Sequence, residues 1–200
     1  MLVRSPVRRG RGGLISPVAV AQGRLQAVEC MREGSEPLGI QAAYVQVDDA
    51  MVDRLVDTPP NKLSDAIEAL EVAGAPTVYL DKMWDGLHFL LTGVSASAPI
   101  EGNKLSEAIV GVHVFESEDF AGCTELDELP DVIAALEAAP LDELLAAARF
   151  TDFGAAEVYP NTWTDDPAQL SDELASAYRD LLAAHRACLS AGNHLVISIL

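Results

Sequence analysis

Four polar residues of one segment have the types and the spacing of a small acid–base site. Asp81, Asp85, His88 and Thr92 stand at i, i+4, i+7 and i+11. Because a helix turns about 100° per residue, the four would share an arc of roughly 60°. A carboxylate beside a histidine orients the imidazole ring and raises its basicity, as a general base requires. Thr92 would then offer an oxygen to a ligand.

The same pattern also has a structural interpretation. His88 would lie at the edge of the core and satisfy its ring nitrogens locally, while Asp81 would only cap the helix. Two aromatic residues allow a similar pair of interpretations. Tyr159 and Trp163, in a loop anchored by Pro160, would either line a ligand cleft or close the side of the core.

Sequence motifs for common cofactors and nucleophiles are missing. The sequence contains no GxSxG elbow, no GxxxxGK[ST] phosphate loop and no GxGxxG after a predicted strand. The four histidines form no HxH or HxxxH pair, and the three cysteines form no CxxC pair. We therefore expect no cofactor and no metal site.

The segment that carries His88 is itself the predicted centre of the fold. Leu80, Trp84, Leu87 and Leu91 share one helical face. Asp81 and Gly93 are residues typical of a helix start and a helix end. Apolar residues also occupy the opposite side, which predicts a helix over 81–92 that is covered on both sides, with Trp84 and Leu87 among the least accessible side chains.

Composition limits the classes of partner. The chain carries 31 acidic and 13 basic residues in 200, a formal net charge of −18. Nucleic acids and anionic lipids bind through neutralised phosphates, so this charge argues against both and favours either a basic protein partner or none. No apolar run approaches the roughly 20 residues of a membrane span, and three cysteines without a CxxC pair fit a reducing cytoplasm.

Residues 1–37 differ from the rest of the chain. They hold six arginines and three glutamates, so their charge is +3 and that of the remaining 163 residues is −21. Their Gly and Pro content predicts a disordered arm, or an over-long start with translation beginning near codon 31 or 38. Arg8-Arg9 and the apolar residues 14–21 also resemble a short export signal, although Pro17 interrupts it.

The remaining pattern predicts a small sheet and several helices. Strands are expected at 40–47, 112–115 and 194–200, the last of them apolar enough to be buried on both faces. Residues 116–126 are acidic and are expected to be irregular. Helices are expected, besides 81–92, at about 49–56, 62–72, 103–110, 129–138, 141–150 and 167–191.

Four segments carry a family resemblance. The motifs LDKMWDGLHFLLTG (80–93), KLSEAIVG (104–111), EVYPNTW (157–163) and GNHLVISIL (192–200) resemble the YfbM-like family of small bacterial proteins of unknown function. The resemblance covers about residues 38–200. It implies a compact α+β domain in the cytoplasm, and it implies no activity. Residues 1–37 have no counterpart in it.

Together these observations predict a single compact α+β domain, with a small sheet covered by five or more helices and a buried central helix. Strands and helices do not alternate regularly, so a parallel wound sheet is disfavoured. For function, a binding or interaction protein with an acidic surface is favoured; some antitoxin-like immunity proteins share this profile. The alternative is a hydrolase or transferase that uses His88 with Asp81 or Asp85. The sequence does not define the oligomeric state.

Overall fold

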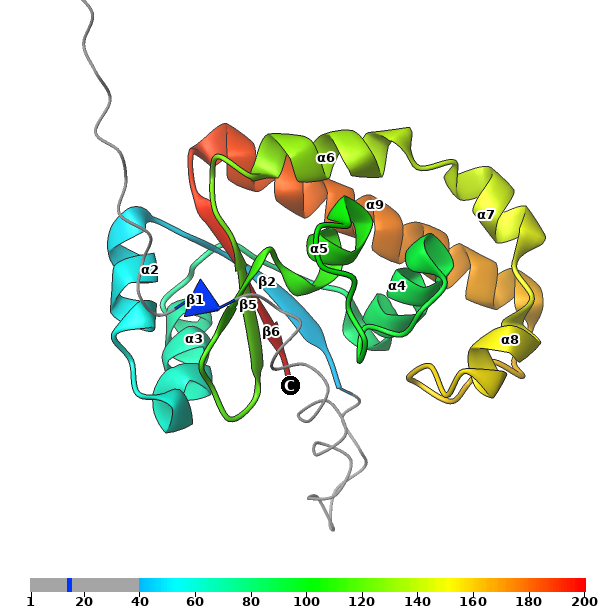
Figure 1. Ribbon diagram of the computed structural model, residues 1–200, viewed down its shortest axis with the longest axis horizontal. Helices are drawn as coiled ribbons and strands as arrows, with labels where there is room; N and C mark the ends of the chain where they lie inside the picture. Colours follow the sequence, from blue (N-terminus) through cyan, green and yellow to red (C-terminus); the bar gives the residue numbers. More distant parts are fainter. Residues whose placement is uncertain (1–13, 16–39) are drawn as a thin grey trace, which may run out of the picture.

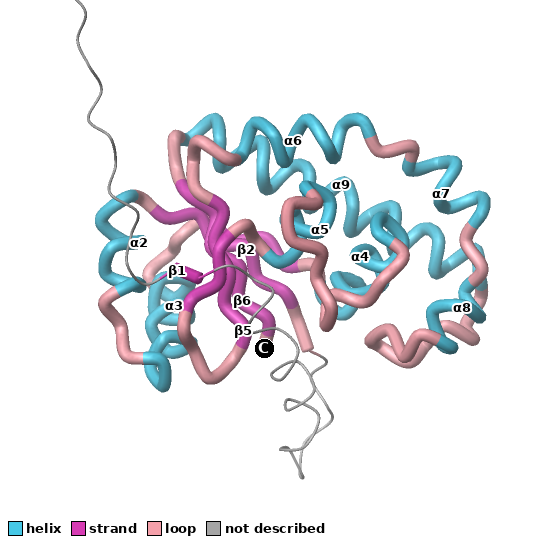
Figure 2. Tube along the Cα trace, in the orientation of Figure 1, coloured by secondary structure: helices cyan, strands magenta, loops and turns pink. Residues whose placement is uncertain are grey.

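The computed structural model describes residues 14–15 and 40–200. Its centre is one antiparallel sheet, with strands in the order β1-β4-β5-β6-β2-β3. The sheet divides the helices into two groups: α2 and α3 lie on one face, and α4 to α9 lie on the other, with α7 and α8 farthest from the strands (Figures 1 and 2). The predicted α+β class is confirmed.

The strands are short and the helices supply most of the mass. The strands are β1 (Leu14–Ile15), β2 (Ala42–Val47), β3 (Thr77–Tyr79), β4 (His113–Phe115), β5 (Phe120–Thr124) and β6 (His194–Ile199). The α-helices are α2 (Asp49–Val56), α3 (Leu63–Val72), α4 (Trp84–Thr92), α5 (Lys104–Val110), α6 (Leu129–Ala138), α7 (Leu141–Ala147), α8 (Phe150–Ala155) and α9 (Pro167–Ala191). Two 3-10 turns, η3 (Pro60–Lys62) and η4 (Asp81–Met83), precede α3 and α4.

Alternation along the strands gives the sheet two cores. On β6, Leu195 and Ile197 point into the larger core under α4, α5, α6 and α9, whereas Val196 points into the smaller core under α2 and α3. Every residue of β6 is buried, as predicted for a strand covered on both faces.

Helix α4 confirms the predicted central element. Trp84 and Leu87 are among the buried residues of the larger core, and Phe89 on another side packs against Phe153 of α8, with 4.7 Å between ring centroids. Gly93 ends the helix in a left-handed conformation (φ 81°). The predicted role of Asp81 as helix cap is wrong, because residues 81–83 form a separate 3-10 turn and no side chain caps either start.

Strand β5 is the main element that the sequence pattern hid. It falls within 116–126, which we expected to be irregular, yet Phe120–Thr124 is wholly buried between β4 and β6. Gly122 has to be glycine here, since a Cβ would lie 2.0 Å from the carbonyl oxygen of Val110. Acidic residues on both flanks masked this short apolar run.

The expectations for residues 1–37 fall outside the described residues, apart from β1. Leu14 and Ile15 pair with Phe115 and Val114 of β4, which places β1 at one edge of the sheet. The other edge strand is β3, which pairs with β2 on its inner side. Leu80, directly after β3, continues this ladder by donating from its backbone N–H to the carbonyl of Ala42 (3.0 Å).

Candidate functional site

His88 lies at the buried end of the predicted polar cluster and is fully enclosed. Its Nδ1 is 2.8 Å from the carbonyl oxygen of Val94, and its Nε2 is 2.7 Å from Oγ of Ser106 on α5. A carbonyl can only accept, so Nδ1 carries the proton and Nε2 accepts from the Ser106 hydroxyl. Both ring nitrogens are therefore satisfied inside the protein.

The neighbours of His88 complete a closed network. Thr92 donates from its hydroxyl to the backbone carbonyl of His88 (2.7 Å), one turn back on α4. Ser106 in turn accepts from the backbone N–H of Ile100 (2.9 Å). Burial lowers the pKa of His88, against the opposing effect of the Val94 carbonyl and of the Asp85 charge, which favours the neutral ring.

Asp85 is buried beside this network, but its carboxylate serves other groups. It accepts from the backbone N–H of Ala96 (2.6 Å), the backbone N–H of Tyr159 (2.8 Å) and the Ser95 hydroxyl (3.2 Å). Asp85 thus connects α4 to the loop that follows it and to the loop at Tyr159, which is 74 residues away in sequence. Its hydrogen bonds run to these loops, whereas the acid–base interpretation requires one to the ring of His88.

The two aromatic candidates lie in the core wall. Trp163 donates from its indole N–H to the carbonyl of Val158 (2.7 Å), and its ring packs against Phe150 and Phe153. Tyr159 stacks on Trp84, with 5.9 Å between ring centroids, and its hydroxyl accepts from the backbone N–H of Ile40 (2.7 Å). This packing favours the core-closing interpretation for both residues, and any role in ligand binding stays a prediction.

Asp81 is separated from the other three candidates and faces solvent. It is one of two described non-glycine residues with positive φ (39°), a conformation that aspartate tolerates better than most residues. Its carboxylate accepts from the side-chain amide of Gln41 (3.4 Å). The sequence cluster therefore divides into a buried part around His88 and an exposed part at Asp81.

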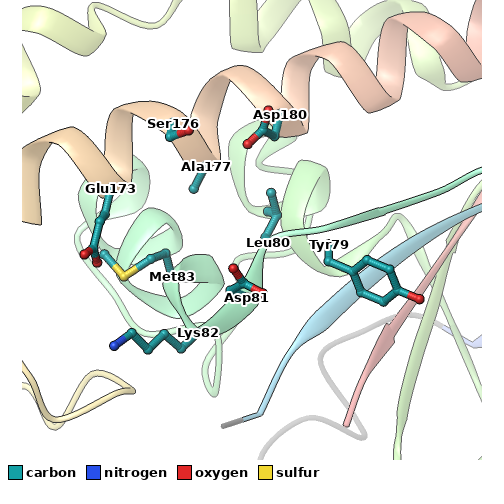
Figure 3. Close-up of a pocket in the computed structure, with 9 residues that line it drawn as sticks. All are labelled: Tyr79, Leu80, Asp81, Lys82, Met83, Glu173, Ser176, Ala177 and Asp180. Atoms are coloured by element: carbon teal, nitrogen blue, oxygen red, sulfur yellow. The ribbon is translucent and has the colours of Figure 1, made fainter. Parts of the chain in front are cut away.

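Asp81 borders a groove that is open to solvent, of about 350 Å³, between η4 and α9. In Figure 3, Glu173 and Asp180 extend from α9 on one side, Asp81 and Lys82 lie on the opposite side, and Met83 lies between them. Tyr79 and Leu80 lead into the groove from β3. The full lining is Tyr79, Leu80, Asp81, Lys82, Met83, Glu173, Ser176, Ala177 and Asp180.

The charge of this groove is predominantly negative. The lining contains three carboxylates (Asp81, Glu173 and Asp180) and one ammonium group (Lys82), whose side chain in Figure 3 runs along the side of the groove opposite α9. Leu80, Met83 and Ala177 give the groove an apolar floor. A groove of this kind accommodates a side chain with an aliphatic stem and a cationic end, such as lysine or arginine.

Two other properties of the described residues bear on function. They contain no group of three or more His, Cys, Asp or Glu side chains placed to hold a metal ion. None of their helices combines the length and the apolar character needed to cross a membrane.

Sequence reasoning missed Ser106 and the α9 wall of the groove. Ser106 sits on the buried face of α5, and nothing in its local pattern indicated a histidine partner 18 residues away. Glu173, Ser176 and Asp180 stand at i, i+3 and i+7 of α9, so they form one polar stripe beside the apolar face. That spacing was a readable signal for a shared surface, but its partner surface on η4 appears only after folding.

Comparisons with known proteins agree with the resemblance. The chain is 30% identical over 166 residues to Protein YfbM of Escherichia coli (strain K12), covering 81% of this chain and 99% of that protein. The crystal structure of YfbM, described as a protein of unknown function, superposes with a TM-score of 0.70 at 29% identity and covers 80% of this chain and 99% of that chain. The sequence model of a family described as "Domain of unknown function (DUF1877)" matches residues 38–198. The chain is similar to YfbM of Escherichia coli, and it belongs to the DUF1877 family.

Proposed function

We propose that this protein is an interaction domain that binds a basic protein partner through the groove between η4 and α9. The observation that carries the proposal is that solvent reaches the acidic groove but does not reach His88 and Ser106. The groove is open and lined by three carboxylates, whereas His88 and Ser106 are fully buried and satisfy each other.

The charge of the whole chain supports the same proposal. A net charge of −18 attracts cationic partners over a Debye length of about 8–10 Å and accelerates their encounter. A groove with an apolar floor then holds one basic side chain in a fixed place, which a diffuse charge alone does not do. A cytoplasmic location, which the odd number of cysteines and the absence of a CxxC pair favour, is part of this proposal.

An octalysine titration tests the proposal, with fluorescence anisotropy as readout. The groove variant Asp81→Asn/Glu173→Gln/Asp180→Asn should weaken binding at least tenfold. The control variant Asp142→Asn/Glu143→Gln/Asp172→Asn makes the same change in charge at exposed positions of α7 and α9 outside the groove lining. Equal losses in both variants would mean that octalysine binds to total charge, and the groove proposal would fail.

A second candidate function is favoured by one distance. The 2.7 Å contact between Ser106 Oγ and His88 Nε2 is the contact of a serine nucleophile with its base. The hydrolase or transferase predicted from the sequence paired His88 with Asp81 or Asp85 instead, so Ser106 takes the place of the carboxylate in this candidate. A substrate would reach it only after movement of residues 94–100, which carry the Val94 and Ile100 contacts.

A fluorophosphonate probe separates the two candidates. The interaction proposal expects no labelling of Ser106, as judged by mass spectrometry of the intact protein. Stoichiometric labelling that is lost in Ser106→Ala would instead support the hydrolase or transferase candidate.

A further inference from the structure

We infer that the basic partner binds as an extended segment that adds a strand to the outer edge of β3 and places a cationic side chain in the adjoining groove. This inference rests on the proposed function and specifies how the partner is held. It starts from the two edges of the sheet. β1 and β3 are the two edge strands, no strand of the described residues lies outside either, and the groove adjoins β3.

The register of β3 defines which backbone groups are offered. Leu80 donates to the carbonyl of Ala42, and Gln46 donates to the carbonyl of Pro76. Hydrogen-bonded pairs alternate in an antiparallel ladder, so Val78 is the bonded residue between them, opposite Tyr44. The backbone N–H and C=O groups of Thr77 and Tyr79 therefore point away from β2. This is the pattern that an added strand pairs with.

The surface beside this edge is unusually apolar for an exposed position. The Tyr79 side chain is 49% exposed, and its hydroxyl donates to Glu71 of α3. Val72, the next residue of α3, is 83% exposed, which is the highest value among the large apolar residues of the described chain. An added strand would cover the Tyr79 side chain, on the face of the sheet opposite α9.

The groove continues directly from the edge. Tyr79 and Leu80, the end of β3 and the residue after it, belong to its lining together with Asp81 and Asp180. A segment paired with Thr77 and Tyr79 would thus carry its next side chain toward the carboxylates. Alternate residues of a strand share one face, so the geometry favours a partner in which basic and apolar residues alternate.

The charges also decide against a second copy of this chain as the occupant. Pairing two β3 edges would bring together two chains that each carry a net charge of −18. Like charges in such a contact are repulsive, and charged residues at sheet edges discourage self-association. A basic partner strand satisfies the same backbone groups and removes the repulsion.

The test uses the full chain and an eight-residue peptide in which lysine and valine alternate. We expect saturable binding by anisotropy, at least tenfold weaker when the peptide amides are N-methylated, because methylation removes the donors of a strand. Hydrogen exchange should slow at the Thr77 and Tyr79 amides in the complex.

Two substitutions at one position isolate the backbone contribution. Thr77→Pro removes the outward N–H and should weaken binding at least tenfold, whereas Thr77→Ala keeps that N–H and should bind as the natural protein does. Circular dichroism and the melting temperature establish that both variants are folded. Unchanged affinity for the methylated peptide and for Thr77→Pro would overturn strand addition.

Variants that remove groove charges distinguish failure of strand addition from failure of the proposed groove site. If Asp81→Asn/Asp180→Asn weakens binding but the backbone changes do not, the groove stands and strand addition falls. If no basic peptide binds at all, both fall. A dimer of the chain that Thr77→Pro dissociates would assign the edge to a second copy and would also overturn the inference.

Discussion

The side chain of Ser106 determines what His88 can do. Its hydroxyl donates to the His88 ring and its oxygen accepts from the backbone N–H of Ile100. Ser106 therefore connects α5 to His88 on α4 and to the loop at Ile100. Such a group is costly to remove, because its former partners stay buried without hydrogen bonds.

We predict that Ser106→Ala lowers the free energy of unfolding by about 1–3 kcal/mol. The reason is that His88 Nε2 and the Ile100 N–H lose their partner in a closed site. Urea denaturation followed by tryptophan fluorescence measures the change. Ser97→Ala, at a half-buried position in the loop, is the milder control, and equal small effects in both variants would contradict the buried-network account.

A second buried histidine sets the pH dependence of stability. Burial lowers the pKa of His185 to about 4, although the carbonyl of Leu181 opposes this shift by accepting from Nδ1 (2.9 Å). In the unfolded chain the pKa is about 6.5, so the unfolded state binds the proton first as the pH falls. Stability is then complete above about pH 6.5 and is lost between 6.5 and 4.

We predict a loss of about 3 kcal/mol from His185 over this pH range, with His88 acting in the same direction. His113 acts oppositely, since its hydrogen bond to Glu128 (2.9 Å) raises its pKa; its contribution is present below pH 6.5 and is lost as the pH rises through the raised value. Urea midpoints from pH 4 to 8 measure the sum. His185→Leu should flatten the acidic side of the curve, and an unchanged slope in that variant would contradict the assignment.

At the scale of elements, the close contact between α4 and the loop that carries Trp163 depends on a glycine in the helix, Gly86. Gly86 sits on α4 where a Cβ would lie 2.1 Å from the Trp163 ring. The helix accepts this glycine, although alanine would favour helix formation by about 1 kcal/mol. The indole ring occupies the space that the glycine leaves.

We predict that Gly86→Ala destabilises the protein by about 1–3 kcal/mol through overpacking, despite the better helix propensity of alanine. Gly154→Ala on α8 is the matched control, because no atom lies within 4 Å of its would-be Cβ. That variant should be neutral or slightly stabilising. Thermal unfolding of both variants is the measurement, and a stabilised Gly86→Ala would show that Trp163 does not pack as described.

The helices and strands differ in how well they can be predicted from their sequence. The long helix α9 has an aspartate cap that accepts from Ala168, a first-turn proline and a left-handed Gly192, and all three signals could be read beforehand. Helix α4 was predictable from its apolar spacing. Strand β5 was not, because five buried residues between acidic flanks carry no period of their own.

The candidate site was only partly predictable for a related reason. Helical spacing correctly placed Thr92 beside His88, since that relation is local. It could not place Ser106, Val94 or Tyr159, whose contacts come from other segments. The separation of Asp81 from the cluster follows from the 3-10 turn, where the angles of an α-helix do not apply.

At the scale of the whole molecule, the part of the chain that matches the family is the part that forms the α+β domain. The family match spans residues 38–198, and the similar protein YfbM is covered over 99% of its own length by 81% of this chain. The antiparallel pair of β2 and β6 at the centre of the sheet begins and ends within about one residue of this range.

We predict that a chain starting at Leu38 folds with a melting temperature within about 3 °C of the full chain, a change worth about 1 kcal/mol at this size. The described contact that it loses is the two-residue pairing of β1 with β4. Differential scanning calorimetry makes the comparison. A drop of more than about 10 °C would mean that the first 37 residues are part of the folded core.

The most direct test of the central claim, that the groove between η4 and α9 is the binding site, is an NMR titration with the lysine–valine peptide. Amide shift changes should concentrate at residues 77–83 and 176–180, and they should fade as salt screens the carboxylates. Changes centred on Val94, Ser106 and His88, or spread evenly over the acidic surface, would contradict the claim.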